Sequence, residues 1–286
     1  MLTPNRPRLR ALTLLAAVLS LVLIAACGDD DDSGSGVDSG DAAPFDVSVE
    51  NAGGSVAFDA PQRAAAGLTA ITLANESKKP EDLQLIKVEG KRSEQEVVAA
   101  YNQVGRGGAP IPAWFLAGGG VPTTGSGDSA TVEQVLEPGT YYGFTSGTQG
   151  HMSFQVTGQA SDAELPEADA TVSAFEYGFK AEGLKSGENR IRFENMGAQP
   201  HHMLAFPIIG NASVEDVKQF VKTEKGKPPV DFEQEVSTAV LEGQTSQLVD
   251  VKLGKPGRYA LLCFISDRQG GPPHALKGMV TEVDVE

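Results

Sequence analysis

The chain has 286 residues, with 23 Lys and Arg against 38 Asp and Glu, and a formal net charge of −15. This acidic balance argues against nucleic acid as a partner and against adhesion to anionic lipid through charge. With two cysteines in the whole chain, a framework of several disulfides is excluded.

The N-terminus has the pattern of a targeting segment. Three arginines among residues 1–10 precede an apolar run over residues 11–24. A run of this length fits the core of a signal peptide and is shorter than the ~20 residues of a membrane-spanning helix. It ends in IAAC, which resembles the lipobox of bacterial lipoproteins. The resemblance implies cleavage after residue 26, a lipid on the sulfur of Cys27, and a protein anchored to the outer face of the cell membrane. An uncleaved apolar anchor is the alternative, and it also places the rest of the chain outside the cytoplasm.

Residues 27–43 form a linker rich in Gly, Ser and Asp without apolar periodicity. Such a segment cannot bury enough apolar surface to offset the entropy of ordering, so we expect a flexible acidic tether. Loss of residues 1–26 would remove three arginines and lower the net charge from −15 to −18. The remaining chain is long enough for two domains of ordinary size.

An internal repeat organises this remainder. Sliding the chain by about 120 residues superposes residues 71–90 on 191–210, and aligns Asn75 with Asn195. Residues 93–101 and 213–221 each start with Ser followed by acidic residues, which predicts a capped helix in each copy. The polar stretch 157–169 separates the copies. We therefore predict domains over residues 44–160 and 168–286.

Each copy is predicted to be an all-β, Greek-key sandwich with one short inserted helix. Its segments are short, rich in Val, Ile, Phe, Thr and Tyr, and separated by Gly and Pro. In the second copy the expected strands are 171–179, 189–195, 201–208, 245–253, 258–265 and 278–285.

Three motifs of the second copy resemble the cupredoxins, the blue-copper family. NMGAQPHHM resembles the family's Asn followed, after a short turn, by a ligand histidine. YALLC resembles the strand that ends in the ligand cysteine, and HALKGM matches the His-to-Met spacing of many of its ligand loops. The resemblance implies one copper ion held by His201, Cys263, His274 and Met279. The ten residues between Cys263 and His274 make this gap longer than in small electron-transfer members and nearly as long as in copper nitrite reductases.

Chemistry and cysteine usage favour the same ligand set. A thiolate, two imidazoles and a weak thioether suit a copper ion that cycles between two oxidation states. Outside the cytoplasm an unpaired thiol is prone to oxidation unless it is buried or metal-bound. Strand alternation places His201 on one face and His202 on the other, and an exchange of their roles stays open.

The first copy lacks these donors. Glu81 stands at the position of His201 and Thr145 at that of Cys263, which leaves His151 and Met152 without a thiolate or a second imidazole. The leading hypothesis is an electron carrier with an unknown redox-partner protein, and not an enzyme, because too few histidines remain for a second copper site. The alternative is a metal-free binding or structural module, and a copper-storage role is a third possibility.

Overall fold

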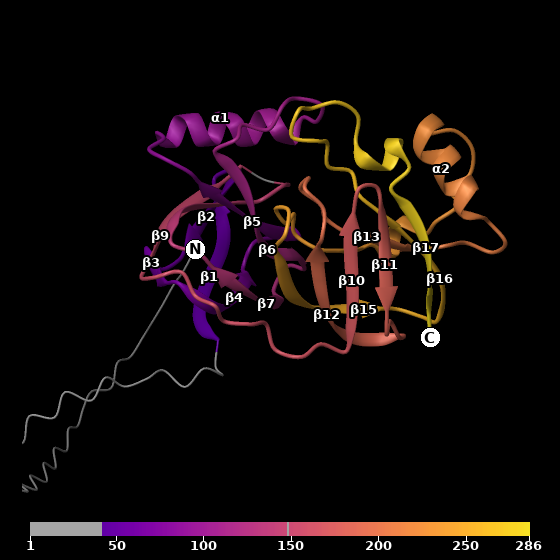
Figure 1. Ribbon diagram of the computed structural model, residues 1–286, viewed down its shortest axis with the longest axis horizontal. Coiled ribbons are helices and arrows are strands. Elements are labelled where there is room, and N and C mark those ends of the chain that lie inside the picture. Colours follow the sequence, from indigo (N-terminus) through magenta and orange to yellow (C-terminus); the bar gives the residue numbers. More distant parts are fainter. Residues whose placement is uncertain (1–41, 148) are drawn as a thin grey trace, which may run out of the picture. The chain divides into compact units, whose positions relative to one another are not determined.

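A computed structural model describes residues 42–147 and 149–286 (Figure 1). The predicted signal peptide, Cys27 and nearly all of the acidic tether lie outside these residues. The described chain is mostly β, with its strands in three sheets and two α-helices, which confirms the predicted all-β class. Neither α-helix is long and apolar enough to cross a membrane.

Strands of the first copy are β1 Ala43–Ala52, β2 Ser55–Asp59, β3 Arg63–Ala65, β4 Gly67–Asn75, β5 Glu81–Val88, β6 Phe115–Thr124, β7 Ser129–Leu136, β8 Gly139–Phe144 and β9 His151–Thr157. Strands of the second copy are β10 Ala170–Phe175, β11 Gly178–Glu182, β12 Gly187–Asn195, β13 Leu204–Pro207, β14 Val236–Ser237, β15 Ser246–Leu253, β16 Gly257–Leu262 and β17 Val280–Val285. The helices are α1 Glu94–Gly105 and α2 Val214–Thr223, with 3-10 turns η1 Phe232–Gln234 and η2 His274–Lys277.

Each copy is a sandwich of two sheets around an apolar core. In the first copy β2-β1-β4-β7 faces the sheet β3-β9-β8-β5-β6, and in the second β11-β10-β12-β15 faces β14-β13-β16-β17. Burial alternates along the strands, as in β12, where Ile191 and Phe193 are buried and Arg192 and Glu194 are not. This period-two pattern turns one side of each strand inward, and the buried sides merge into a single core cluster.

One sheet is shared by the two copies. Strands β7 and β15 pair antiparallel, which joins the two four-stranded sheets into one of eight strands. The fourth residue of β7, Val132, lies opposite the fourth residue of β15, Val249. Because equivalent positions of the repeat face each other, the two copies meet in a nearly two-fold symmetric pairing. Both copies belong to one compact unit, Ser39–Glu286.

Each copy carries one helix, at the predicted place. The side chain of Ser93 accepts a hydrogen bond from the backbone N–H of Glu96, and the side chain of Glu96 accepts one from the backbone N–H of Ser93. Ser213 and Asp216 form the same two hydrogen bonds at the start of α2. These reciprocal contacts satisfy amide groups that the first turn of a helix leaves without partners.

One predicted strand is wrong in detail. Residues 171–179 form two strands, β10 and β11, that turn back on each other around residues 176 and 177. Apolar residues occupy positions 172 and 174 and then 175, 177 and 179, so the alternation changes phase just before the turn, a signal that the prediction of one strand did not use. The turn matters because it carries Glu176 toward the site described next.

Candidate metal centre

Three predicted ligands meet inside the second copy. The Nδ1 atoms of His201 and His274 lie 3.0 Å apart, and the Sγ atom of Cys263 lies 3.7 Å from the first and 3.5 Å from the second. All three side chains are 0% exposed. In the part of the chain that the structure describes, they form the one group of three or more His, Cys, Asp or Glu side chains close enough to share an ion.

A rigid turn positions His201. The Asn195 side chain donates to the carbonyl of Gln199 at 2.7 Å and of Leu241 at 3.0 Å, and accepts from the N–H of Gly197 at 3.0 Å. The backbone of His201 forms both hydrogen bonds of a bridge with Leu241. Five hydrogen bonds therefore fix the segment before the histidine enters the core.

The same turn recurs in the first copy, as the repeat predicts. Asn75 donates to the carbonyls of Lys79 and Thr124 at 2.8 Å each and accepts from the N–H of Ser77 at 2.9 Å. Asn75 and Asn195 are each 1% exposed. The turn is thus a property of the repeated fold, and the second copy alone places a histidine after it.

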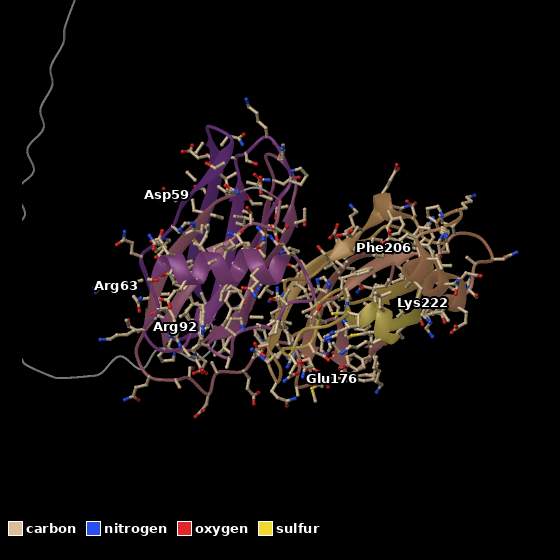
Figure 2. The ribbon with its side chains drawn as sticks, turned by 90° about the horizontal axis from the view of Figure 1, so that it is seen from above. Asp59, Arg63, Arg92, Glu176, Phe206 and Lys222 are labelled. Carbon is tan, nitrogen blue, oxygen red and sulfur yellow. The ribbon has the colours of Figure 1, made fainter. Side chains whose placement is uncertain are left out.

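His202 points to the other side, as strand alternation predicts. Its Nε2 accepts a hydrogen bond from the N–H of Phe264 at 2.9 Å, and its ring does not join the three-residue cluster. Met203 and Ala205 lie with Cys263 in the core cluster, whereas Phe206 (Figure 2) lies in the separate cluster under α2. The structure therefore places His201, and not His202, beside the thiol.

Cys263 follows directly after β16, which lies between β13 and β17 in its sheet. Its sulfur accepts hydrogen bonds from the backbone N–H groups of His202 and Ile265, and its carbonyl accepts from the N–H of Ala275 at 2.7 Å. The backbone around the thiol thus supplies two donors that stabilise negative charge on sulfur.

His274 and Met279 stand at the two ends of η2. The N–H of His274 donates to Ile265 O at 2.8 Å, and the N–H of Met279 donates back to His274 O at 3.0 Å. Gly278 adopts a φ of 103° between them, a conformation that favours glycine. Met279 is 0% exposed and belongs to the same core cluster as Cys263. The structure therefore places Met279 in the core on the ligand loop, in the cluster that contains the thiol.

Two carboxylates that the sequence did not reveal hold the outer edges of the imidazoles. His201 Nε2 lies 3.3 Å from Glu176 Oε1, and His274 Nε2 lies 3.0 Å from Asp267 Oδ1. Glu176 (Figure 2) also accepts from the backbone N–H groups of Ala198 and Gln199 at 2.8 and 2.7 Å. Neither residue has a motif of its own, although Asp267 lies in the loop between two proposed ligands, where an acidic partner for a ligand histidine is worth seeking.

The charges and hydrogen bonds around the site determine the protonation state and the tautomer of both imidazoles. Burial lowers the pKa of His274 to about 4 and also lowers the pKa of His201, so both rings are neutral at neutral pH. Burial alone would raise the pKa of Glu176 and Asp267, but hydrogen bonds outweigh it and both pKa values lie below their usual range. An ionised carboxylate only accepts, so each Nε2 carries the proton and each Nδ1 presents a lone pair to Cys263.

This donor set fits a cation. Two nitrogen lone pairs 3.0 Å apart repel unless a proton or a metal ion lies between them. Donors held ~2.0–2.3 Å from one tetrahedral or trigonal ion stand about 3–4 Å from each other, and the three separations fall in that range. Burial raises the pKa of the Cys263 thiol to about 12, so a bare thiolate is unfavourable there without a positive partner.

The first copy offers no comparable cluster among its described residues. Glu81 and Thr145, at the positions of His201 and Cys263, are buried at 1% and 4% exposure. His151 lies elsewhere, on the surface, with its Nε2 2.8 Å from Glu94.

The first copy does hold the loop that carries His274. Arg268, in the middle of this loop, donates to Glu242 and to the carbonyls of Pro112 at 3.4 Å and Phe115 at 3.3 Å. The N–H of Ile111 donates to Arg268 O at 2.8 Å, and the N–H of Gly271 donates to Gly108 O at 3.0 Å. The long gap between Cys263 and His274 is therefore ordered by contacts with the other copy.

Comparison with known proteins gives likenesses at the level of structure. No protein family model matches the chain, and no curated protein matches its sequence. The similar solved structures are cupredoxins and two-domain copper proteins. Reduced auracyanin from the photosynthetic bacterium Roseiflexus castenholzii is 17% identical, over 41% of this chain and 94% of its own, with a TM-score of 0.27. Copper nitrite reductase from Nitrosomonas europaea is 14% identical, over 85% of this chain and 94% of its own, with a TM-score of 0.25. Since both TM-scores lie below 0.5, the functional proposal rests on the donor set alone.

Proposed function

We propose that the chain is a lipid-anchored, extracytoplasmic copper protein that transfers single electrons. His201, Cys263 and His274 would hold one copper ion, with the thioether of Met279 as a weak fourth ligand. The observation that carries the proposal is the triangle of two Nδ1 atoms and one Sγ atom, fully buried and with both Nε2 atoms facing carboxylates. One thiolate, two imidazoles and a distant thioether are the donor set of copper electron-transfer sites.

When bound, copper would supply a one-electron redox couple. The protein's part is to keep the ligands in place as the charge changes. Glu176 and Asp267 hold the rings through their Nε2 atoms, and the N–H groups of His202 and Ile265 hold the sulfur. The buried, hydrogen-bonded frame limits rearrangement of the donors, and it excludes water from a thiol that is otherwise open to oxidation.

A carrier is favoured over an enzyme by the remaining histidines. After His201 and His274 are assigned, His151 and His202 are left, and each already has a partner, Glu94 for the first and the N–H of Phe264 for the second. A catalytic second metal site would need imidazoles that converge on another point. Anchoring through Cys27 is proposed from the lipobox pattern alone, and the redox partner is proposed to be another extracytoplasmic protein.

The test is the visible spectrum of the full mature chain after addition of one equivalent of copper(II). We expect an intense thiolate-to-copper absorption band that disappears on adding one electron equivalent of reductant and returns on reoxidation. Cys263→Ser should abolish the band, and His151→Ala, which changes an imidazole outside the cluster, should leave it unchanged. A colourless protein, or a Cys263→Ser variant that binds copper with undiminished affinity, would refute the proposal.

A metal-free binding module is the second candidate. The first copy supports it, because that copy keeps the sandwich and the Asn75 turn with no donor cluster among its described residues. It predicts that copper has no effect on the thermal unfolding of the chain, whereas the proposed site would raise the unfolding temperature when copper is bound.

A further inference from the structure

A cavity of about 360 Å³ lies between the two copies. Its apolar walls come from both, with Ile86, Val104 and Val121 from the first and Leu204 and Phe264 from the second. This volume falls within the range of cavities that hold small organic molecules, and such cavities are common where two domains meet. Nothing in the proposed copper chemistry uses it.

The ionisable residues that line the cavity are acidic, apart from a neutral histidine and a tyrosine. Of the residues that the structure describes, Asp82, Glu235 and Glu242 line it, and no Lys or Arg does. Glu242 is paired with Arg268, which leaves two carboxylates without a cationic partner among the described residues. Partial loss of hydration raises the pKa of Asp82 and of Glu235, as expected for carboxylates at a cavity wall without a positive charge nearby. His202, also in the wall, accepts the N–H of Phe264 through its Nε2, so this nitrogen offers no proton to the cavity.

The carboxylates differ in what already holds them. Asp82 is half-buried, and its Oδ1 accepts from the N–H of Ser146 at 2.7 Å. Glu235 is more exposed, and it has no hydrogen bond or ion pair in the part of the chain that the structure describes. Aromatic rings lie in the same wall, namely those of Tyr101, Phe115 and Phe264. Carboxylates beside aromatic faces are the surroundings that attract an organic cation.

We propose that this cavity binds a small organic cation, with an apolar body and a protonated amine. The body would lie against the apolar walls, and the ammonium group would pair with Asp82 or Glu235. A neutral molecule would gain the same apolar contacts without the ion pair, and an anion would meet two uncompensated carboxylates. The charge of the ligand therefore decides its affinity, and binding does not require the metal.

The cavity also adjoins the metal centre. Phe264 and His202 line it, and they directly follow the proposed ligands Cys263 and His201 in the chain. Their own contact, Phe264 N–H to His202 Nε2 at 2.9 Å, ties the two backbones together beside the cavity. If the proposed function holds, an occupant that moves this contact should also shift the absorption band of the copper form.

The test uses calorimetry on the full mature chain without metal and three probes with one body, 1-naphthylmethylamine, 1-naphthalenemethanol and 1-naphthoate. We expect the amine to bind at least tenfold more tightly than the alcohol, and the carboxylate to bind weakest. Glu235→Gln and Asp82→Asn should each weaken the amine about three- to tenfold and leave the alcohol unchanged. Asp59→Asn (Figure 2), an exposed acid of the first copy outside the cavity, is the matched control and should change neither.

A second variant, Val104→Trp, should abolish binding of the amine and the alcohol alike because its ring would fill the cavity. Circular dichroism and urea unfolding check that each variant is folded, and Glu235→Gln, at an exposed position, carries the test if Asp82→Asn is unstable. Equal affinity for amine and alcohol, unchanged amine affinity in folded Glu235→Gln, or no binding of any probe at millimolar concentration would overturn the inference. Each of these results is obtained without copper, so none depends on the proposed function.

Discussion

Replacement of Arg268 tests whether the first copy holds the ligand loop in place. Arg268 and Glu242 are each about one-fifth exposed, at 19% and 18%. Removing one partner of a fully buried ion pair costs about 3–5 kcal/mol, and of an exposed pair about 0–1 kcal/mol. For this intermediate pair, and with the contacts to Pro112 and Phe115 also lost, we expect Arg268→Ala to cost about 2–3 kcal/mol.

This cost should appear first as local opening of the loop. The loop covers Cys263, whose thiol is 0% exposed and reacts only when the surrounding structure opens. An opening made easier by about 2–3 kcal/mol exposes the thiol roughly 30- to 150-fold more often. The assay is the rate of labelling of Cys263 by a thiol reagent in metal-free protein under native conditions, where the rate follows the population of the open form.

Arg190→Ala is the matched control. Arg190 likewise pairs with a glutamate, Glu133 of the first copy at 2.7 Å, but it does so on the eight-stranded sheet and away from the loop. It is more exposed, at 35%, and its loss should cost about 1 kcal/mol or less. Urea unfolding of both variants separates global from local effects. Equal acceleration of labelling in the two variants, once global stability is allowed for, would contradict the reasoning.

Two further predictions compare the matched asparagines of the repeat and two glycines of the first copy, one in β6 and one in the loop after it. Asn195→Ala and Asn75→Ala should each lower the free energy of unfolding by about 2–4 kcal/mol, because each leaves buried backbone groups without partners. Chemical denaturation measures both losses. Only Asn195→Ala should also weaken copper binding. Gly120→Ala should prevent correct folding, since its methyl group would lie 1.9 Å from the carbonyl oxygen of Leu83. Gly127→Ala, at a φ of 83° and with open space around it, should lower the free energy of unfolding by only about 1–2 kcal/mol. Equal yields of folded protein for the two variants would disprove this contrast.

Local patterns predicted much of the second copy. The Ser–acidic signature located both helices, because capping depends on residues three apart in the chain. Alternation around His201 predicted which histidine enters the core, because successive residues of an extended chain face opposite ways. The repeat placed Asn75 and Asn195 in the same role. Each of these features could be predicted because it depends on residues close together in the chain or on the internal repeat.

The features that the sequence did not show depend on distant contacts. The carboxylates of Glu176 and Asp267 reach the imidazoles only because the turn after β10 and the ligand loop are folded over them. The pairing of β7 with β15 joins two strands that lie more than a hundred residues apart and carry no mark of their partner. The cavity is lined by side chains of both copies, so neither copy taken alone would form it.

The β7–β15 pairing also gives the first copy, which has no donor cluster among its described residues, a structural role. Were the second copy produced alone, β15 would become an unprotected edge, with open N–H and C=O groups ready to pair with another molecule. The first copy blocks that edge permanently and does so with its own equivalent strand, so the chain resembles a homodimer whose subunits have been fused. In the folded chain, β7 thus occupies the position at which a second molecule could otherwise add a strand to β15.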